Sequence, residues 1–537
     1  MNNYNSQAAT DVVAMDIHQP DHMVSFGKKK GCYISRSVSL LLAVFFLSGM
    51  VATGLLVYYY APHDVGAKAQ QKETIRYTQA NDNTRNVIPE VNKPSKISTT
   101  TTTSTTTTTT TTPMPTTTTT TTTTTMAPKE KMNVRLPRSL KPMHYLVKLQ
   151  PLINGNFSIL GYVEVEMEVL EPTSNITLHI ADIITYNDTV KINGMGNETA
   201  PGIKMHEYDN YREFYIAHLD RELQQGEKYV LSMEFLAYLN DQLRGFYRSS
   251  YKDDDGKDKM LAVTQFQATS ARRAFPCFDE PGLKATFEVY LGRQENMSSI
   301  SNMPIMETMP VEGQEGWFWD HYEKSVPMST YLVAFVVSDF ANMNSTVNDH
   351  VLFRVWSRQS AIEQAEYSRD IGPAILTHFE DYFGEPYPLP KQDMIAIPDF
   401  SAGAMENWGL ITYRETAMLY DPVVSGPSNK HRVALVVAHE LAHQWFGNLV
   451  TPTWWTDLWL NEGFASFVQY IGMDYVEPSW KVMEEFVVSR LQRVFALDSL
   501  ESSHEISIPV GHPDEIRQIF DSISYDKGEV LLFHCYC

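Results

Sequence analysis

The sequence predicts a multidomain α+β protein in which a membrane-spanning helix and a disordered stalk precede the folded part. Short runs that alternate apolar and polar residues fill the region from about residue 135 to residue 340, and longer helical patterns dominate after it. Runs of strands followed by runs of helices are typical of α+β folds or of separate domains. A length of 537 residues also exceeds the usual size of one domain.

The N-terminal part has the features of a membrane anchor. Residues 1–37 form a polar tail that contains Lys28, Lys29 and Lys30, and residues 38–60 carry no charge. About 23 apolar residues are enough to cross a bilayer, and the preceding positive charges keep that end in the cytoplasm. We therefore expect a single-pass type II protein of the plasma membrane with its C-terminal bulk outside the cell. The alternative is a cleaved signal peptide, which the long leader and the long apolar run disfavour.

Residues 61–131 predict a disordered, threonine-rich stalk. Between Thr99 and Thr125 the sequence is almost wholly threonine, so nothing there can pack a core. Threonine with proline is typical of an O-glycosylated, extended stalk. A disordered linker without sugar is the alternative.

Composition limits the class of partner. The formal net charge of −21 argues against nucleic acid, because phosphate binding needs a basic surface. Four cysteines are too few for a disulfide framework in a chain of this size.

Six N-glycosylation sequons all follow the apolar segment, as the expected topology requires; they are at Asn156, Asn175, Asn187, Asn197, Asn296 and Asn344.

The folded part divides into two predicted domains. Alternating runs such as 145–150 and 162–169 indicate strands. After Phe340 we expect helices, at residues 360–383, 430–446, 457–473 and 477–497. The boundary is therefore placed near residue 340, which gives a β-rich N-terminal domain over 132–340 and a second domain over 341–537.

The segment His439-Glu440-Leu441-Ala442-His443 carries the most specific chemistry. It follows an apolar run, 433–438, that is typical of a buried helix. Residues four apart share a helix face, so both imidazoles can reach one metal ion. This is the physical basis of the H-E-x-x-H zinc-protease motif.

Zinc hydrolases usually have three protein ligands and a water in the fourth position. A third histidine at the end of H-E-x-x-H-x-x-G-x-x-H is excluded, because Phe446 and Leu449 occupy the glycine and histidine positions. Glu462, in Asn-Glu-Gly on the next predicted helix, is the other option, and the 18 residues 444–461 leave room for a loop and a return helix. We assign His439, His443 and Glu462 as ligands of one zinc ion per chain. Glu440, beside the zinc-bound water, then suits a general base.

A second motif lies upstream of the zinc motif, and its sequence is Gly403-Ala404-Met405-Glu406-Asn407. Together with the zinc motif it resembles the thermolysin-like zinc aminopeptidases of the aminopeptidase N type. Segments within 135–145, 265–281 and 327–331 match the same family, so the resemblance covers roughly residues 133–531. It implies a β-saddle domain followed by a thermolysin-like α/β zinc peptidase domain.

The resemblance also implies roles for single residues. Glu406 would bind the free α-amino group of a peptide substrate, and Gln267 would line the first side-chain pocket. Tyr525 would stabilise the oxyanion by a hydrogen bond. Further substrate-binding positions are Gly403, Ala404, Met405 and Asn407.

The family pattern stops after Leu531, where members continue with a β-sandwich and a large helical domain. We therefore expect a truncated catalytic domain with an open cleft, in which Tyr525 lies near a fraying end. The first hypothesis is a cell-surface zinc aminopeptidase that removes N-terminal residues from peptides. The second is a catalytically impaired form that acts as a peptide-binding or decoy membrane protein. A third, a mucin-like adhesion protein, is disfavoured because the catalytic residues are intact. The sequence predicts no oligomeric state.

Overall fold

The computed structural model describes residues 134–196, 199–347 and 351–536, all within one compact unit. The expected cytoplasmic tail, membrane helix and stalk lie outside these residues, as does the sequon at Asn197. None of the described helices is long and apolar enough to cross a membrane.

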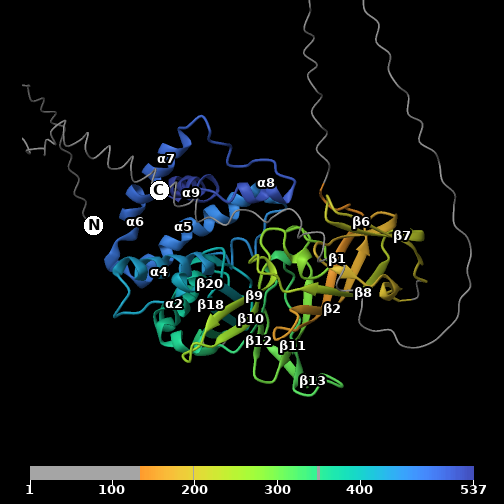
Figure 1. Cartoon of the computed structure of the whole chain (residues 1–537). Helices are drawn as coiled ribbons and strands as arrows, with labels where there is room; N and C mark the ends of the chain where they lie inside the picture. Colours follow the sequence, from red (N-terminus) through yellow and green to blue (C-terminus); the bar gives the residue numbers. More distant parts are fainter. Residues whose placement is uncertain (1–133, 197–198, 348–350, 537) are drawn as a thin grey trace, which may run out of the picture. The chain divides into compact units, whose positions relative to one another are not determined.

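The N-terminal part is built on an eight-stranded sheet in the order β13-β14-β11-β1-β2-β8-β4, with β5 also paired to β8 (Figure 1). Along β2 the side chains of Val163, Val165 and Met167 are buried and their neighbours are partly exposed, which is the alternation of a one-sided strand. The strand bounds are β1 Leu140–Pro151, β2 Ser158–Val169, β4 Ile184–Thr185, β5 Lys191–Gly194, β8 Lys228–Tyr238, β11 Thr286–Gln294, β13 Ile305–Pro310 and β14 Trp317–Tyr322.

Two smaller sheets complete this β-rich part. One has the order β12-β15-β10-β9, with bounds β12 Ser298–Ser301, β15 Phe335–Ser338, β10 Asp258–Gln265 and β9 Gly245–Lys252. The other has the order β3-β7-β6, with bounds β3 Thr173–His179, β7 Phe214–Leu223 and β6 Ile203–Asp209. A β-rich N-terminal part followed by a helical part confirms the order of elements that the sequence predicts.

A five-stranded sheet begins the second part and was not anticipated strand by strand. Its order is β16-β17-β18-β20-β19, with bounds β16 Ala341–Val347, β17 Val351–Ser357, β18 Lys391–Ile397, β20 Leu410–Arg414 and β19 Ala404–Met405. Strands β17, β18 and β20 run parallel, and every residue of β18 is buried. The short strand β19 lies at the edge of the sheet, next to β20.

Helices pack beside this sheet and against one another. The longer ones are α2 Glu366–Phe383, α4 Pro427–Ala442 and α5 Leu458–Val476, and the shorter ones are α3 Glu415–Met418, α8 Pro513–Gln518 and α9 Gly528–Tyr536. Helix α2 contacts β16 and β17, and the three helices α2, α4 and α5 all contact one another. Pro427 begins α4 at the first turn, where a missing N–H is tolerated.

The single helix expected over 477–497 is wrong. The segment is a 3-10 turn Pro478–Trp480, helix α6 Val482–Phe486, a π-helical turn Val487–Leu491 and helix α7 Gln492–Asp498. Lys481 has a φ of 54°, a left-handed conformation that no α-helix accommodates. Other short turns are at Asn187–Thr189, Ala271–Arg273, Thr330–Leu332, Gln359–Ala365, Trp455–Asp457 and Ile523–Lys527.

One connected cluster of buried apolar side chains runs through both parts, from Leu136 to Val530. The β-rich part and the helical part are therefore packed on each other and not merely tethered. This packing fixes the position of loops from the first part relative to helices of the second, which the site described next requires.

Candidate metal centre

Helices α4 and α5 bring the three predicted ligands together. His439 lies in the last turn of α4, and His443 caps the C-terminal end of this helix; their Nε2 atoms are 3.1 Å apart. The Oε2 atom of Glu462 on α5 is 3.5 Å from His439 Nε2 and 3.2 Å from His443 Nε2. Among the described residues, this is the group of three whose ligand atoms all lie within 4.8 Å of one another.

These distances fit zinc. Ligand atoms bound to one tetrahedral zinc ion at its usual bond lengths lie roughly 3.3 Å apart. The three observed separations of 3.1, 3.2 and 3.5 Å bracket that value. Two imidazole nitrogens and a carboxylate oxygen also match the donor set of a catalytic zinc site with one open position.

The second ring nitrogen of each histidine, Nδ1, also has a hydrogen-bond partner. His443 Nδ1 lies 2.8 Å from the carbonyl oxygen of Phe446, so it donates there and leaves Nε2 free for a metal. His439 Nδ1 lies 3.1 Å from Oε1 of Gln469. Sequence reasoning missed Gln469, although it is seven residues after Glu462 and so shares its face of α5.

The electrostatics of the cluster favour a bound cation. Burial alone would lower the pKa of His443, but Glu406, Glu462 and Glu440 raise it to about 10. Burial would raise the pKa of Glu462, yet His443 and His439 lower it to about 2. Carboxylates that hold a proton on His443 this strongly would stabilise a metal dication in the same place.

Glu440 is placed to act as a base. It is buried, and its Oε2 has no hydrogen-bond partner within the described residues. Burial raises its pKa well above the ordinary value, and Glu406 and Glu462 add to this, while His443 opposes it. A carboxylate that is neither a metal ligand nor engaged by a donor is free to accept a proton from a neighbouring water.

Glu406 lies in the same buried region, on the segment that follows β19. Its Oε1 accepts a hydrogen bond from Nε2 of Gln267 at 3.2 Å, so the β-rich part reaches into the site. Its carbonyl oxygen accepts from Asn448 at 2.8 Å and from Gln444 at 3.4 Å. Burial, and then Glu462, raise the pKa of Glu406 to about 7, with His443 opposing. Gln444 and Asn448 were not among the predicted site residues.

The other residues of the segment 403–407 contact the neighbouring strand β20 and the β-rich part. Ala404 and Met405 pair with Tyr413 and Thr412 across β19 and β20. Met405 is buried and its Sδ lies 3.6 Å from Nε2 of Gln265. Asn407 donates to Thr412 Oγ1 at 3.1 Å, and the Gly403 carbonyl accepts from Arg414 N at 2.9 Å.

Tyr525, on the π-helical turn before α9, lies beside the metal ligands. Its ring stacks on that of His439, with 6.2 Å between centroids and 17° between planes. Burial and the nearby Glu462, to which its hydroxyl donates, raise its pKa well above the ordinary value. The hydroxyl therefore stays protonated and able to donate at neutral pH.

The described sequons lie in the β-rich part and in β16. Asn156, Asn187, Asn296 and Asn344 are exposed, and Asn175 is half-buried. Accessibility of this kind is needed for glycosylation but does not establish it.

Two models of known protein families match this chain. The M1 N-terminal domain model of the peptidases matches residues 141–332, and the Peptidase family M1 domain model matches residues 367–535.

The chain belongs to the M1 peptidase family. Aminopeptidase N of Canis lupus familiaris is 45% identical over 411 residues, which is 74% of this chain and 42% of that protein. Aminopeptidase N of Homo sapiens is 43% identical over 411 residues, with the same coverage of the two chains. Endoplasmic reticulum aminopeptidase 1 of Rattus norvegicus is 43% identical over 403 residues, again 74% of this chain and 42% of that protein. The chain thus spans less than half the length of these M1 relatives, and its cluster of His439, His443 and Glu462 is a zinc site typical of M1 peptidases.

Proposed function

We propose that this chain is a zinc aminopeptidase that removes N-terminal residues from peptides at the cell surface. The observation that carries the proposal is the convergence of His439, His443 and Glu462 beside two further buried carboxylates, Glu440 and Glu406. Family membership and the relatives named as aminopeptidases support the same activity.

The chemistry divides among these residues. A zinc ion on the three ligands would acidify a water molecule and polarise the scissile carbonyl. Glu440 takes the proton of the attacking water and delivers it to the leaving amine. Burial raises the pKa of Glu440 above its ordinary value, which makes it a stronger base than an exposed carboxylate. Tyr525 donates a hydrogen bond to the oxygen that gains negative charge.

The position of Glu406 favours a peptidase that removes single N-terminal residues over one that cleaves within a peptide chain. Its carboxylate is buried near the ligands, where an ammonium group gains more from an ion pair than it would in water. Gln267 orients this carboxylate through the 3.2 Å hydrogen bond, and we propose that it also lines the pocket for the first side chain of a substrate. The edge strand β19 offers backbone groups on its open side, so an extended peptide can pair with it.

The proposal extends to domains and location. We infer two domains, 132–340 and 341–537; the gap between the two family matches, 333–366, brackets this boundary. The tail, anchor and stalk proposed for residues 1–131 would place both domains outside the cell. Occupied glycans at the described sequons would support this topology, and so would digestion of the folded part by protease added to intact cells.

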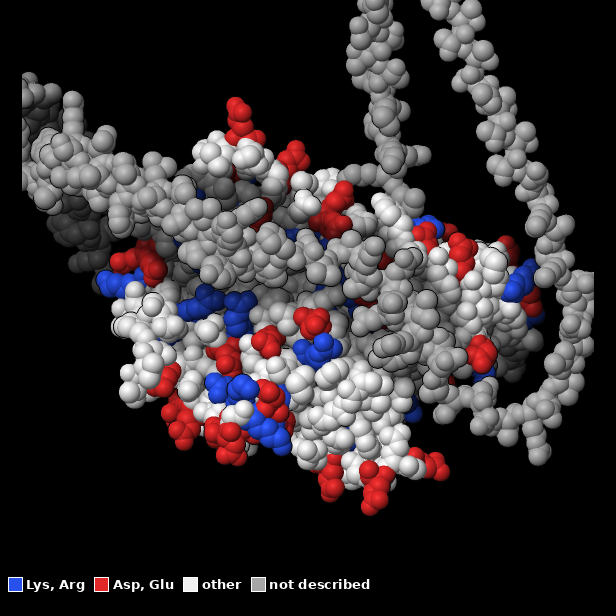
Figure 2. All heavy atoms as spheres, viewed as in Figure 1, with Lys and Arg blue, Asp and Glu red and all other residues white. Residues whose placement is uncertain are grey.

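Peptides are proposed as substrates in preference to nucleic acid. The net charge is −21, and acidic and basic side chains are interspersed on the face that Figure 2 shows. A phosphate backbone requires a continuous basic footprint, which the described residues on this face do not form.

The decisive experiment measures release of a fluorophore from an aminoacyl amide by the purified full chain. We expect release with one bound zinc per chain, loss on chelation and recovery on zinc addition. An N-acetylated substrate should not be cleaved, because Glu406 would then face no ammonium group. Absence of release at stoichiometric zinc would overturn the proposal and favour the non-catalytic, peptide-binding alternative.

A further inference from the structure

A polar cavity lies apart from the metal centre and shares no lining residue with it. Its volume is 280 Å³, and it lies where loops of the β-rich part meet the start of α8. Three arginines line it, Arg244, Arg273 and Arg517, together with the hydroxyl-bearing residues Tyr211, Thr269 and Ser270. A cavity lined by several guanidinium groups and hydroxyls is suited to an oxyanion.

The carboxylates of the cavity are already engaged. Glu213 accepts from Arg273 Nη2 and from Arg272 Nη1, both at 2.9 Å, so neither of its oxygens faces the cavity unpaired. Asp514 is ion-paired with Arg517. Two of the three lining guanidinium groups are therefore paired with carboxylates: Arg517 with Asp514, and Arg273 with Glu213 and with Asp182, which lies outside the lining.

Arg244 is the lining arginine that no described carboxylate pairs with. Its Nε and Nη2 atoms donate to Oε1 of Gln242 at 3.0 and 2.7 Å, and it forms no ion pair with any carboxylate of the described residues. Burial, and then the charges of Arg273 and Arg517, lower the pKa of Arg244, while Asp182 and Glu213 oppose this lowering. Its guanidinium group is thus partly desolvated, and a bound anion would compensate for the lost hydration.

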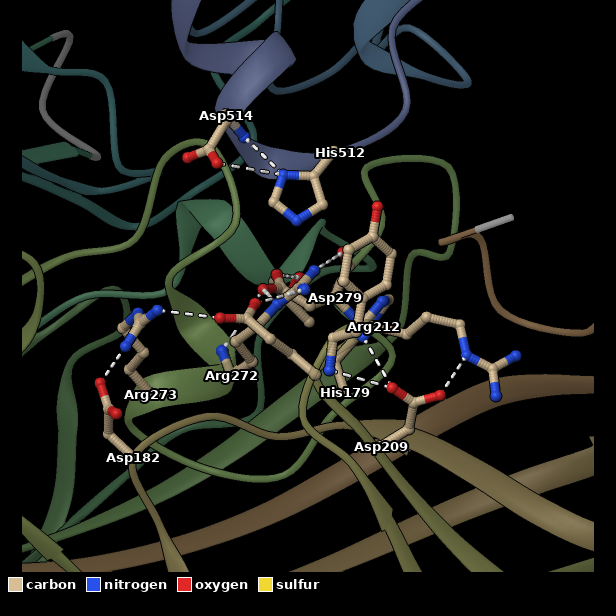
Figure 3. Close-up of polar contacts among 12 residues, drawn as sticks. His179, Asp182, Asp209, Arg212, Arg272, Arg273, Asp279, His512 and Asp514 are labelled. Carbon is tan, nitrogen blue, oxygen red and sulfur yellow. Dashed lines mark hydrogen bonds and ion pairs between the residues drawn. The ribbon is translucent and has the colours of Figure 1, made fainter. Parts of the chain in front are cut away.

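The walls of the cavity are held in place, as Figure 3 shows for the Arg272 and Arg273 network. The buried Arg272 donates to Asp279 at 2.9 Å as well as to Glu213, and Arg273 also pairs with Asp182. Glu213 has a φ of 55°, a left-handed conformation that costs about 1 kcal/mol or more for a non-glycine residue. The rings of His512 and Tyr211, which both line the cavity, have their centroids 5.5 Å apart.

We propose that this cavity binds a phosphate group, held by Arg244, Arg273 and Arg517. A tetrahedral phosphate has enough oxygens to accept hydrogen bonds from three guanidinium groups at once. A carboxylate, with one charge and two oxygens, uses fewer of them. The volume of 280 Å³ leaves room beside the phosphate for water or for the rest of a phosphate monoester.

Isothermal titration of the full chain with inorganic phosphate, at constant ionic strength, tests the proposal. Arg244→Gln should weaken phosphate binding about tenfold, the usual effect of losing a charge-assisted hydrogen bond. The matched control is Arg221→Gln, which removes one exposed positive charge outside the cavity and should leave the affinity unchanged within twofold. Equal affinity in both variants would overturn the proposal, since binding would then reflect net charge alone.

Two further arms keep the result interpretable. Arg517→Gln, at an exposed side chain, should weaken phosphate binding as Arg244→Gln does; an unchanged affinity would count against the site. Glycerol phosphate in place of inorganic phosphate separates the two sources: tighter binding supports a monoester ligand, and weaker binding supports free phosphate. Acetate should bind at least tenfold more weakly than phosphate, and comparable binding would overturn the preference for phosphate. Because binding is the readout, the outcome does not depend on peptidase activity.

Discussion

Gly463 and Gly528 pack backbone against backbone, and a Cβ atom added to Gly463 would lie 2.8 Å from the Cα atom of Gly528. Gly463 follows the metal ligand Glu462 on α5, and Gly528 begins α9, three residues after Tyr525. This contact sets the distance between the two helices. It therefore also sets how closely the tyrosine hydroxyl approaches the metal centre.

Gly463→Ala should displace Tyr525 from the metal centre. The added methyl group would meet the Cα and C atoms of Gly528 at 2.8 and 3.0 Å, which are backbone atoms that cannot rotate away. Such overpacking typically costs about 1–3 kcal/mol. We expect a lower melting temperature, lower turnover and unchanged zinc content. Gly155→Ala is the matched control, because the nearest atom to its added methyl group, the carbonyl oxygen of Leu152, lies 4.0 Å away. Unchanged turnover in Gly463→Ala would contradict the positioning role of this contact.

Glu440→Gln should retain zinc and lose turnover. Glutamine has nearly the same shape but cannot accept a proton, and loss of a general base typically lowers the rate by about 10²–10⁴-fold. Glu440 makes no ligand bond in the proposed site, so the metal content measured by atomic absorption should equal that of the unaltered chain. Turnover equal to that of the unaltered chain would end the assignment of Glu440 as the base.

Gln469→Leu should weaken zinc binding without removing a ligand. The substitution deletes the group that lies 3.1 Å from His439 Nδ1 and orients this ring. Loss of such an outer partner typically lowers metal affinity by about 10–100-fold. Competition with a zinc-binding dye measures the change. The same substitution at the exposed Gln492 of α7 is the control and should have no effect on zinc affinity.

The metal ligands could be predicted from the sequence because their positions follow from local geometry. His439 and His443 are four apart on one helix, and Glu462 lies at a fixed place on the next. The strand β18 could not be predicted in this way. All seven of its residues, Lys391–Ile397, are buried, so the strand lacks the alternation that marks one-sided strands such as β2.

Other features depend on tertiary contacts that leave no periodic signal. The close approach of Gly463 and Gly528 and the cavity around Arg244 each join segments that are far apart in the chain. Near Lys481 the sequence pattern instead predicts a continuous helix that the structure does not form. A helical pattern continues through residues 477–497, but the backbone turns left-handed at one residue, and the helix divides.

His504 should make stability depend on pH near neutrality. Its Nε2 lies 2.7 Å from Oδ2 of Asp521, and this hydrogen bond raises its pKa above the ordinary value. A raised pKa means that the fold gains stability from protonation below the unfolded pKa of about 6.5, and that this gain is lost as pH rises through the folded pKa. Asp521 also accepts from the backbone of Ile523 and Ser524, so the pair supports the turn that carries Tyr525.

His504→Gln should therefore reduce stability at pH 6 and have little effect at pH 9. A partly exposed pair of this kind is worth about 0.5 kcal/mol, which urea unfolding at the two pH values can resolve. Burial lowers the pKa of His144 and His179, which gives the opposite pH dependence. These residues are present in both proteins, so their contribution cancels in the difference. A stability difference of the same size at pH 6 and pH 9 would show that His504 acts through packing and not through its charge.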